Sequence, residues 1–257
     1  MNLKQYADEY LNMMEMVHKN GHDFNISTIT LICDLDKEQL NIKAISDNFN
    51  EDNMRIKPCK RNKEFEVTKR GKIKKSFFNQ VTINFEDISK KSIKIFLNGK
   101  LQITGLTSMY ECEHVSQMIL NMLRKYLNID VNIKKMRIGM INSNFAVDYD
   151  IDLISLNVIL NHRYKFLSIY NPESYPAINM KIHKIGYDIS IFIFRTGNIV
   201  ITSGRSLNDM QNAYTMILKI LEENEHVKTK KEKMKTKKYQ NKIQDGYYMR
   251  QYLSCCY

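Results

Sequence analysis

The sequence has no tryptophan, three prolines and nine glycines among its 257 residues. Its glycines form neither the Walker nor the Rossmann pattern that holds a nucleotide phosphate. There is also no run of about 18 apolar residues, the length that a membrane-spanning helix needs. The first residues lack the apolar core of a signal peptide. We therefore expect a protein of a reducing compartment, without a membrane span or a nucleotide-dependent active site.

Cysteine and histidine are present, but their spacing matches no known site chemistry. The five cysteines fit neither a zinc motif nor a disulfide framework, which favours buried or incidental thiols. His18 and His22 are four residues apart, but no glutamate lies between them as a zinc-protease motif requires. No histidine is paired with a nucleophile. We expect no catalytic residue, no metal and no cofactor, and thus no enzyme.

Positive charge is in excess. The chain has 39 Lys and Arg against 28 Asp and Glu, a net charge of +11 and an isoelectric point near 9.2. Such a charge favours an acidic partner, with nucleic acid first and an anionic membrane second, although it also serves solubility alone. The lysine-rich run at residues 228–242 permits two interpretations. It either attracts phosphates in a salt-dependent way or forms a disordered solubilising or localising tail.

The most informative feature is an internal repeat. Residues 93–104 (IKIFLNGKLQIT) and 191–202 (IFIFRTGNIVIT) each contain two alternating strands around a turn that ends in glycine. This pattern predicts a β-hairpin, and Asn98-Gly99 is the stronger turn signal. The two hairpins are offset by 98 residues throughout, because 194 − 96 and 202 − 104 both equal 98.

The repeat continues on both sides of the hairpins. Ser108 and Ser206, again 98 residues apart, are candidate N-caps of a following helix. The predicted helices carry apolar faces at matching positions: Val115, Met118, Ile119, Met122 and Leu123 in one, and Ala213, Met216, Ile217, Ile220 and Leu221 in the other. Upstream, strands are predicted near 26–32, 80–85, 136–141 and 178–183, and short helices near 37–48 and 153–161. Residues 1–20 predict an additional amphipathic helix.

The repeated unit resembles the TATA-box-binding protein family. Residues 170–176 (YNPESYP) resemble the family segment YEPELFP, and residues 191–202 resemble LLIFVSGKIVLTG. In the first copy, residues 26–31 (ISTITL) resemble VATVTL, and residues 95–105 resemble IFASGKMVVTG. The likeness spans roughly residues 24–225 in the family order.

The resemblance implies an α+β fold, a saddle in which two tandem repeats form one curved antiparallel sheet of ten strands with helices on the convex side. We expect an N-terminal helical extension at 1–23, repeats at 24–128 and 129–225, and a basic tail at 226–257. The divergence and the abundance of Lys, Asn and Ile are similar to the versions carried by large DNA viruses. The expected location is intracellular: the nucleus or, for a viral protein, the host cytoplasm or viral factory.

The resemblance also implies a function, in which the concave face binds AT-rich DNA in the minor groove and aromatic wedges kink it. The implied wedges are Phe96 and Phe194 on strands and Phe78 and Tyr175 in the adjoining loops, where Tyr175 replaces a family Phe. The implied floor of the interface consists of Ile26, Thr28, Gln102, Thr104, Ile138, Val200 and Thr202. Lys100 and Lys181 would lie near phosphates.

Several family positions are changed. The register places Phe24 and Met136 where the family has a central asparagine in each half, with Asn25 one residue away. Asn84 replaces an arginine that grips phosphate, and Lys94 replaces a leucine.

The resemblance assigns Glu173 to the surface that contacts a TFIIB-type initiation factor, so that this factor and RNA polymerase are the expected protein partners. An alternative remains open: the chain keeps the saddle as a protein-interaction module and recruits transcription machinery without sequence-specific DNA binding.

Overall fold

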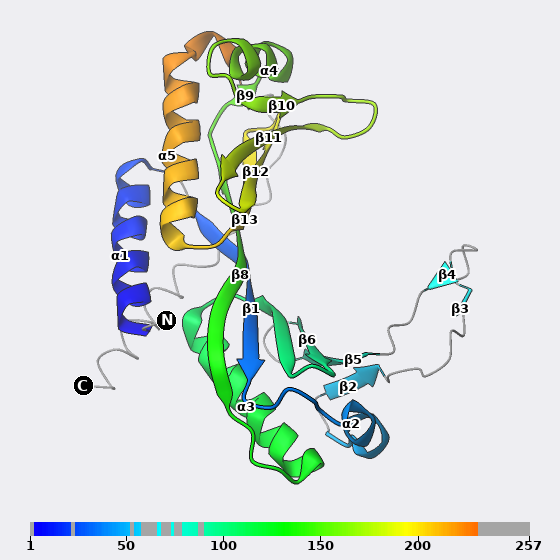
Figure 1. The fold of residues 1–257 in the computed structure, drawn as a ribbon. Helices are drawn as coiled ribbons and strands as arrows, with labels where there is room; N and C mark the ends of the chain where they lie inside the picture. The colour runs from blue at the N-terminus through cyan, green and yellow to red at the C-terminus, as the bar shows by residue number, and fades with distance from the viewer. Residues whose placement is uncertain are drawn as a thin grey trace.

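The computed structural model describes the backbone of residues 3–21, 24–51, 54–57, 66–67, 73–74, 79–86 and 90–230. Ten strands form one sheet in the order β10-β11-β12-β13-β8-β1-β7-β6-β5-β2, with every neighbouring pair antiparallel. The sheet is bent into a saddle, with the long helices on its convex side (Figure 1). The predicted ten-stranded α+β saddle is confirmed.

Each half of the saddle contributes five strands and two helices. The first half contains β1 (Asn25–Leu35), α2 (Ile42–Asn48), β2 (Met54–Lys57), β5 (Gln80–Glu86), β6 (Lys90–Phe96), β7 (Lys100–Leu106) and α3 (Met109–Leu127). The second half contains β8 (Ile133–Ala146), α4 (Leu153–His162), β10 (Leu167–Ile169), β11 (Ala177–Lys184), β12 (Tyr187–Phe194), β13 (Asn198–Gly204) and α5 (Leu207–Glu223). The long strands β1 and β8 pair at the centre and join the halves.

Among the described residues, five short elements and one further long helix belong neither to this sheet nor to the four helices of its two halves. They are α1 (Leu3–Lys19), the pair β3 (Glu66–Val67) and β4 (Ile73–Lys74), the pair β9 (Asp150–Ile151) and β14 (Lys228–Thr229), and a 3-10 turn at Glu225–Val227. The predicted N-terminal helix is therefore confirmed. Phe78 and most of the basic tail lie outside the described residues.

Strand alternation explains how the sheet attaches to its helices. On β6 and β7, Ile93, Ile95, Leu101 and Ile103 are fully buried, and the residues between them are half-buried or exposed. The predicted apolar faces of α3 and α5 supply the other side of this core, with Ile119 and Ile217 essentially inaccessible to solvent. Burial of one sheet face beneath two helices leaves the opposite face open.

Glycine is required at the two hairpin turns. Gly99 and Gly197 have φ values of 74° and 81°, in the left-handed region that L side chains avoid. A Cβ at Gly99 would overlap the backbone oxygen of Lys37, and one at Gly197 would overlap that of Tyr149. The turn glycines seen in the sequence therefore permit both the hairpin geometry and a close approach of a second segment.

The two long helices begin as predicted. The Ser108 hydroxyl accepts the Glu111 N–H at 3.2 Å, and the Ser206 hydroxyl accepts the Asp209 N–H at 3.1 Å. In α5 the Asp209 carboxylate returns the contact to the backbone N–H of Ser206, which completes a capping box. The two helices thus begin with equivalent caps, which supports the prediction that the chain contains two copies of one structural unit.

The first short helix is shorter than predicted, since α2 begins at Ile42 rather than near residue 37. The backbone N–H groups of Leu35, Asp36 and Leu40 are donated to the oxygens of Gly99, Asn132 and Leu97. Because these tertiary bonds occupy the backbone, the helix starts only after Asn41, whose side chain caps it.

Candidate nucleic-acid interface

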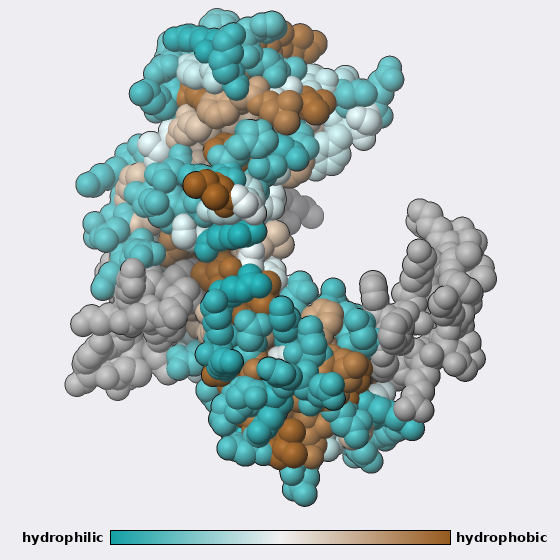
Figure 2. Space-filling model, viewed as in Figure 1, coloured by the Kyte–Doolittle hydropathy of each residue, from teal (hydrophilic) through white to brown (hydrophobic). Residues whose placement is uncertain are grey.

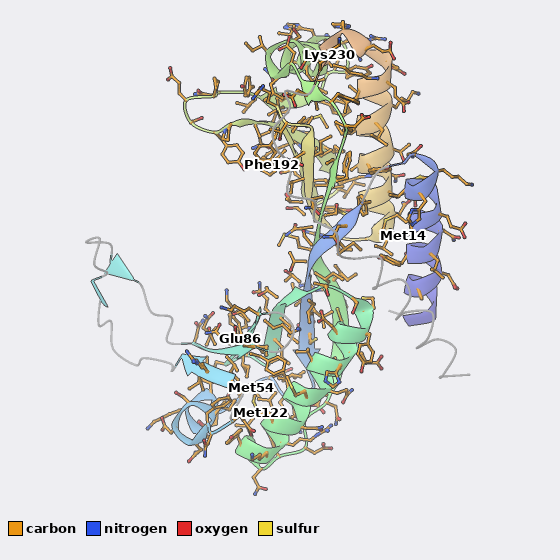
Figure 3. All side chains as sticks on the ribbon, turned by 180° about the vertical axis from the view of Figure 1, so that it is seen from behind. Met14, Met54, Glu86, Met122, Phe192 and Lys230 are labelled. Carbon is orange, nitrogen blue, oxygen red and sulfur yellow. The ribbon has the colours of Figure 1, made fainter. Side chains whose placement is uncertain are left out.

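The open face of the sheet is the candidate site. Figure 2 shows it from the side, as the hollow between the two halves. The face carries the half-buried side chains that alternate with the core residues, including Phe96, Gln102, Thr104, Val200 and Thr202. These five predicted site residues are thus brought to one surface. Figure 3 shows Phe192 on the same face, turned away from α5.

Cross-strand pairing arranges the open face into two equivalent rows, because directly opposed residues in antiparallel strands point to the same side. The first, called here the Lys94 row, consists of Thr82, Lys94, Gln102, Ile32 and Arg137. The second, the Phe192 row, consists of Asn179, Phe192, Val200, Asn144 and Asn25. Lys94 and Phe192 hold the same place in the repeat, as do Gln102 and Val200.

A second pair of rows lies between the Lys94 row and the Phe192 row. One contains Arg55, Asn84, Ser92 and Thr104, and the other contains Leu167, Lys181, Ser190 and Thr202. The Thr104 hydroxyl donates to the Ser92 backbone oxygen at 3.2 Å, and Thr202 donates to Ser190 at 3.4 Å. Each threonine therefore donates its hydroxyl proton to the sheet, and its methyl group and the two lone pairs of its hydroxyl oxygen remain for a ligand.

Aromatic side chains gather at the outer part of the second half. Tyr175 is 47% exposed, and its ring centroid lies 5.7 Å from Phe192 and 6.1 Å from Phe194. The predicted pair Tyr175 and Phe194 is thus in ring contact, and Phe192 joins it. In the first half Phe96 is half-buried opposite Gln80, at the end of β6.

The predicted basic residues have different surroundings. Lys100 is exposed at the start of β7, opposite Asp34. Lys181 lies 3.8 Å from the Asp188 carboxylate, which also contacts His183 Nδ1 at 2.8 Å. To contact a phosphate, the Lys181 ammonium must either keep Asp188 as a second partner or break that ion pair, whereas the Lys100 side chain is already exposed.

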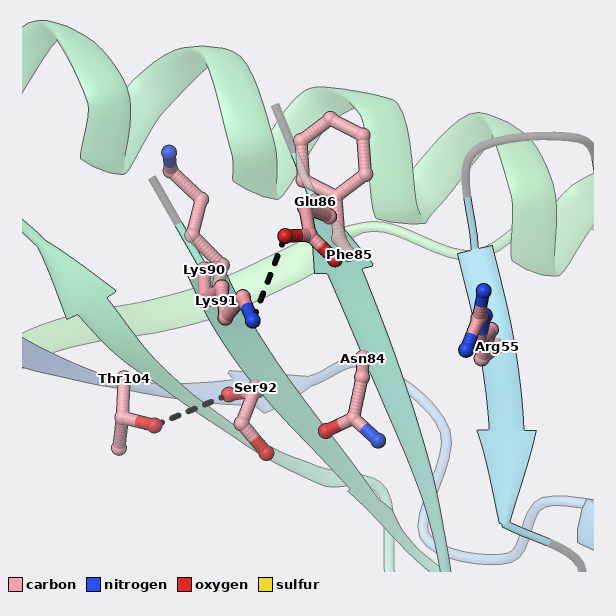
Figure 4. Close-up of a pocket in the computed structure, with 8 residues that line it drawn as sticks. All are labelled: Arg55, Asn84, Phe85, Glu86, Lys90, Lys91, Ser92 and Thr104. Atoms are coloured by element: carbon pink, nitrogen blue, oxygen red, sulfur yellow. Dashed lines mark hydrogen bonds and ion pairs between the residues drawn. The ribbon is translucent and has the colours of Figure 1, made fainter. Parts of the chain in front are cut away.

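At the position equivalent to Lys181, the shorter Asn84 leaves a cavity of about 370 Å³ in the first half. Arg55 and Lys90 stand at its edge, and Ser92 and Thr104 form part of its wall (Figure 4). Lys90 is 3.4 Å from Glu86, an exposed pair. Within the described chain, Arg55 has neither an ion-pair partner nor a hydrogen-bond partner for its side chain.

Two residues that the resemblance assigned to the floor of the interface face the hydrophobic core instead. Ile26 is 7% exposed and belongs to the hydrophobic core, and Ile138 packs against that core opposite Leu31. The register between β1 and β8 shifts between Ile26 and Thr28 and again between Thr30 and Leu31. Each shift reverses the faces, since a bulge adds a residue to a strand with a period of two. Thr28, beyond the first shift, does lie on the open face opposite Asn142.

The same register shifts change which polar side chains the central strands β1 and β8 place on the open face. Phe24 is buried against Phe145 and Tyr214, and Met136 lies opposite the buried Cys33, so neither forms the floor. Asn25 and Asn144 are instead exposed and directly opposed on the open face.

The two central strands therefore do carry asparagine on the open face, although Asn25 and Asn144 both belong to the Phe192 row, and their counterparts in the Lys94 row are Arg137 and Ile32. Asn25, Asn142, Asn144 and Arg137 were missed because strict alternation fails at a bulge, whereas Phe192 lies in a regular hairpin, where it alternates with the predicted Phe194. The run of three adjacent polar residues Asn142, Ser143 and Asn144 in the second part of β8 was the available signal.

Glu173 lies in the turn that leads to Tyr175. The Asn171 side chain accepts the Glu173 backbone N–H at 3.1 Å, and the Asn171 backbone oxygen accepts the N–H of Tyr175 at 2.9 Å. This turn leaves the Glu173 side chain exposed, as a contact with another protein would need.

Comparison with known proteins points to one family. A family model described as transcription factor TFIID, or TATA-binding protein, matches residues 135–224. A TATA-box-binding protein-like protein of Acanthamoeba polyphaga mimivirus is 30% identical, over 84% of this chain and 69% of its own length. The chain belongs to the TATA-binding protein family. It is a divergent member that is similar to a viral relative.

The fold agrees with this family. The structure of the TATA-binding protein of Methanococcus jannaschii matches 78% of this chain and 99% of its own, with a TM-score of 0.55 and 17% identity. Family members are transcription factors, which gives this chain a role related to transcription. Among the described residues no cluster of three or more potential metal ligands occurs, and no helix is long and apolar enough to cross a membrane.

Proposed function

We propose that this protein is a general transcription factor that binds AT-rich promoter DNA in the minor groove, kinks it with aromatic wedges and nucleates transcription initiation. The observation that carries the proposal is the open sheet face, with half-buried polar and apolar side chains at its centre and the Tyr175 and Phe194 rings in contact at its outer part. A broad, shallow face of this kind matches the wide and flattened minor groove of bent DNA.

The chemistry of the centre suits A·T pairs. Both A·T and T·A present acceptors in the minor groove, whereas G·C adds the guanine amino group. Side-chain amides of Asn25 and Asn144 can donate to such acceptors. Val200, Gln102 and the methyl groups of Thr104 and Thr202 leave little room for an additional amino group. The central asparagines thereby weaken the main reason to expect that DNA binding has been lost.

The wedges perform the bending. Insertion of an aromatic edge between base pairs costs unstacking energy, and the added contact along the bent duplex offsets it. Phe194 and Tyr175 would insert at one end of the site and Phe96, with Phe78, at the other. Lys100 and, once separated from Asp188, Lys181 would neutralise the backbone phosphates.

Protein partners follow from the exposed surfaces. We assign Glu173 to the contact with a TFIIB-type initiation factor, because its turn is held by Asn171 while its carboxylate stays in solvent. RNA polymerase would then join through that factor. The alternative function, a saddle that recruits transcription machinery without sequence-specific DNA binding, uses the same turn and no wedge.

The test measures binding and bending together. A duplex labelled at both ends, with an AT-rich centre or a GC-rich one, is titrated across a salt series with the wild type and with Phe96→Ala/Phe194→Ala. We expect the wild type to shorten the end-to-end distance of the AT-rich duplex and the double variant to bind it without bending. Tyr110→Ala, an exposed aromatic on α3 at the convex side, is the matched control and should bend DNA like the wild type.

A different result would favour the alternative. If wild type and double variant bind both duplexes equally, without bending and with a steep salt slope, general phosphate attraction explains the binding. The proposed minor-groove function would then be rejected and the saddle treated as an interaction module.

A further inference from the structure

The chain stays attached to the second half after α5 ends. The 3-10 turn follows α5 directly, and its Val227 is fully buried. The backbone oxygen of Val227 accepts the Asp152 N–H at 2.9 Å, and β14 then pairs with β9. We call residues 225–229 together with β9 the C-terminal clasp. In the first half the chain continues from α3 into β8, so the clasp belongs to the second half alone.

The clasp is fastened to the turn that carries the proposed wedge Phe194. Arg195 directly follows this wedge, and its backbone oxygen accepts the Ile151 N–H at 2.7 Å. The Arg195 guanidinium lies 3.2 Å from the carboxylate of Asp150, which is buried. Since Asp150 and Ile151 form β9, which pairs with β14, the chain is held beside the wedge up to Thr229.

The basic tail therefore leaves the protein at the outer end of the second half. Figure 3 shows Lys230 there, farther from the centre of the saddle than Phe192. Two cations lie at the same end, Arg195 with a side chain that is 60% exposed and Lys228, and each has one carboxylate beside it. Positive charge that exceeds these local pairs begins with the tail itself.

The charge and the length of the tail suit a duplex. Residues 230–242 contain seven lysines and one glutamate. Thirteen extended residues span at most about 45 Å, which exceeds one turn of B-DNA at about 34 Å. A lysine run serves solubility wherever it is attached, so its fixed origin beside the wedge is the feature that favours DNA.

Insertion of Phe194 at the end of the site would place the first base pairs outside the saddle next to the clasp. We propose that residues 230–242 bind the phosphates of this flanking duplex, over about one helical turn beyond the Phe194 end. The attraction is electrostatic and independent of base sequence, because it comes from lysines and phosphates. This inference rests on the proposed minor-groove function and extends the DNA site beyond the saddle.

Affinity is measured on AT-rich duplexes with flanks of about 4 or about 15 base pairs, shorter and longer than one helical turn, across a salt series. The tail variant is Lys231→Gln/Lys233→Gln/Lys235→Gln. The charge-matched control, with substitutions on α1, α2 and α5, is Lys19→Gln/Lys43→Gln/Lys219→Gln. We expect the wild type to bind the long duplex about tenfold more tightly than the short one, and the tail variant to lose most of this preference. Its slope of log K against log salt on the long duplex should fall by about 2 to 3, whereas the control should match the wild type.

The place of contact is measured by DNA cleavage from an iron chelate on a single accessible cysteine. Cys33 and Cys112 are buried and stay in place, and the other three cysteines are changed by Cys59→Ser/Cys255→Ser/Cys256→Ser. Asn198→Cys, exposed in the turn after Phe194, marks the end of the saddle, and Lys242→Cys marks the tail. We expect the cuts from Lys242→Cys to lie about one helical turn outward from those of Asn198→Cys. Cuts spread over the whole duplex, or none from the tail, would overturn the inference.

The outcomes separate this inference from the function beneath it. If the wild type binds and bends the AT-rich duplex but flank length has no effect, or if the tail variant and the control behave alike, the inference is overturned and the proposed function stands. A tail that binds an acidic protein in place of DNA would give this result. If the AT-rich duplex is neither bound preferentially nor bent, both are overturned.

Discussion

At the residue scale, a buried ion pair fastens the sheet to its helix. Lys91 is 3% exposed on the core side of β6, and its ammonium lies 3.1 Å from the Glu111 carboxylate of α3. Glu111 also accepts hydrogen bonds from the backbone N–H and the hydroxyl of Thr107. Burial alone would raise the pKa of Glu111, but the bonds from Thr107 and Lys91 lower it below its usual value. The pair therefore favours the ionised carboxylate in the folded state.

We predict that Lys91→Met destabilises the fold by about 3 kcal/mol at pH 7, because removal of one partner leaves the other charge buried. Because the pKa of Glu111 is lower in the folded state, the ionised carboxylate stabilises the fold at pH values above the ordinary pKa of glutamate. This stabilisation is lost as the pH falls through the pKa that Glu111 has in the folded state. The difference between variant and wild type should accordingly shrink in acid. Urea unfolding at pH 7 and pH 4 measures it, and an equal difference at both would contradict this role of Glu111.

At the element scale, equivalent helix starts are anchored by different partners. In α3 the N3 residue Glu111 binds Lys91, whereas in α5 the N3 residue Asp209 accepts the Tyr187 hydroxyl at 2.9 Å. Asp209 also accepts the N–H groups of Arg205 and Ser206. Both halves therefore have the same helix cap, but a different side chain of the sheet binds it: Lys91 in the first half and Tyr187 in the second.

We predict that Ser206→Ala costs about 1 kcal/mol of folding stability through the lost N-cap. Asp209→Ala should cost about 2 to 3 kcal/mol, since several donors around a buried carboxylate lose their acceptor. The urea midpoints of both variants test the order. Glu222→Ala, an exposed substitution near the end of α5, is the control and should have little effect; a loss equal to that of Asp209→Ala would contradict the capping argument.

At the scale of the whole molecule, the N-terminal helix makes the two halves unequal on the convex side. α1 lies along α5 (Figure 1), with Met13 and Val17 buried and with the Met16 sulfur accepting bonds from Gln211 and Thr215. The open face lies on the other side of the sheet. α1 is thus placed to stabilise the second half without touching the candidate DNA surface.

Deletion of residues 1–20 should lower stability by about 3 kcal/mol or more, because two fully buried apolar side chains are lost. Amide hydrogen exchange should rise in α5, while α3 serves as an internal control. DNA bending should remain at conditions where the shortened chain is folded. If the deletion changes the amide exchange rates of α5 no more than those of α3, α1 does not support α5.

The sequence alone determined the repeat, its hairpins and its helix caps. These features depend on local chemistry: alternation over a few residues, glycine at a turn that requires positive φ, and serine before an amphipathic helix. The order of strands and the saddle came from the resemblance, because pairing between distant strands leaves no local signal. The resemblance also assigned six residues of the regular hairpins to the open face: Phe96, Phe194, Gln102, Thr104, Val200 and Thr202. In these hairpins strand alternation holds, so the structure places all six on that face.

The tertiary structure decided what lies at the centre of that face. Register shifts between β1 and β8 turn Ile26 and Ile138 toward the core and expose Asn25 and Asn144, and a bulge is fixed by the partner strand rather than by its own sequence. The pairing of Lys181 with Asp188 and the alignment of Lys94 with Phe192 depend equally on neighbouring strands. Local pattern thus determined the elements, and packing between them determined which side chains face the proposed ligand.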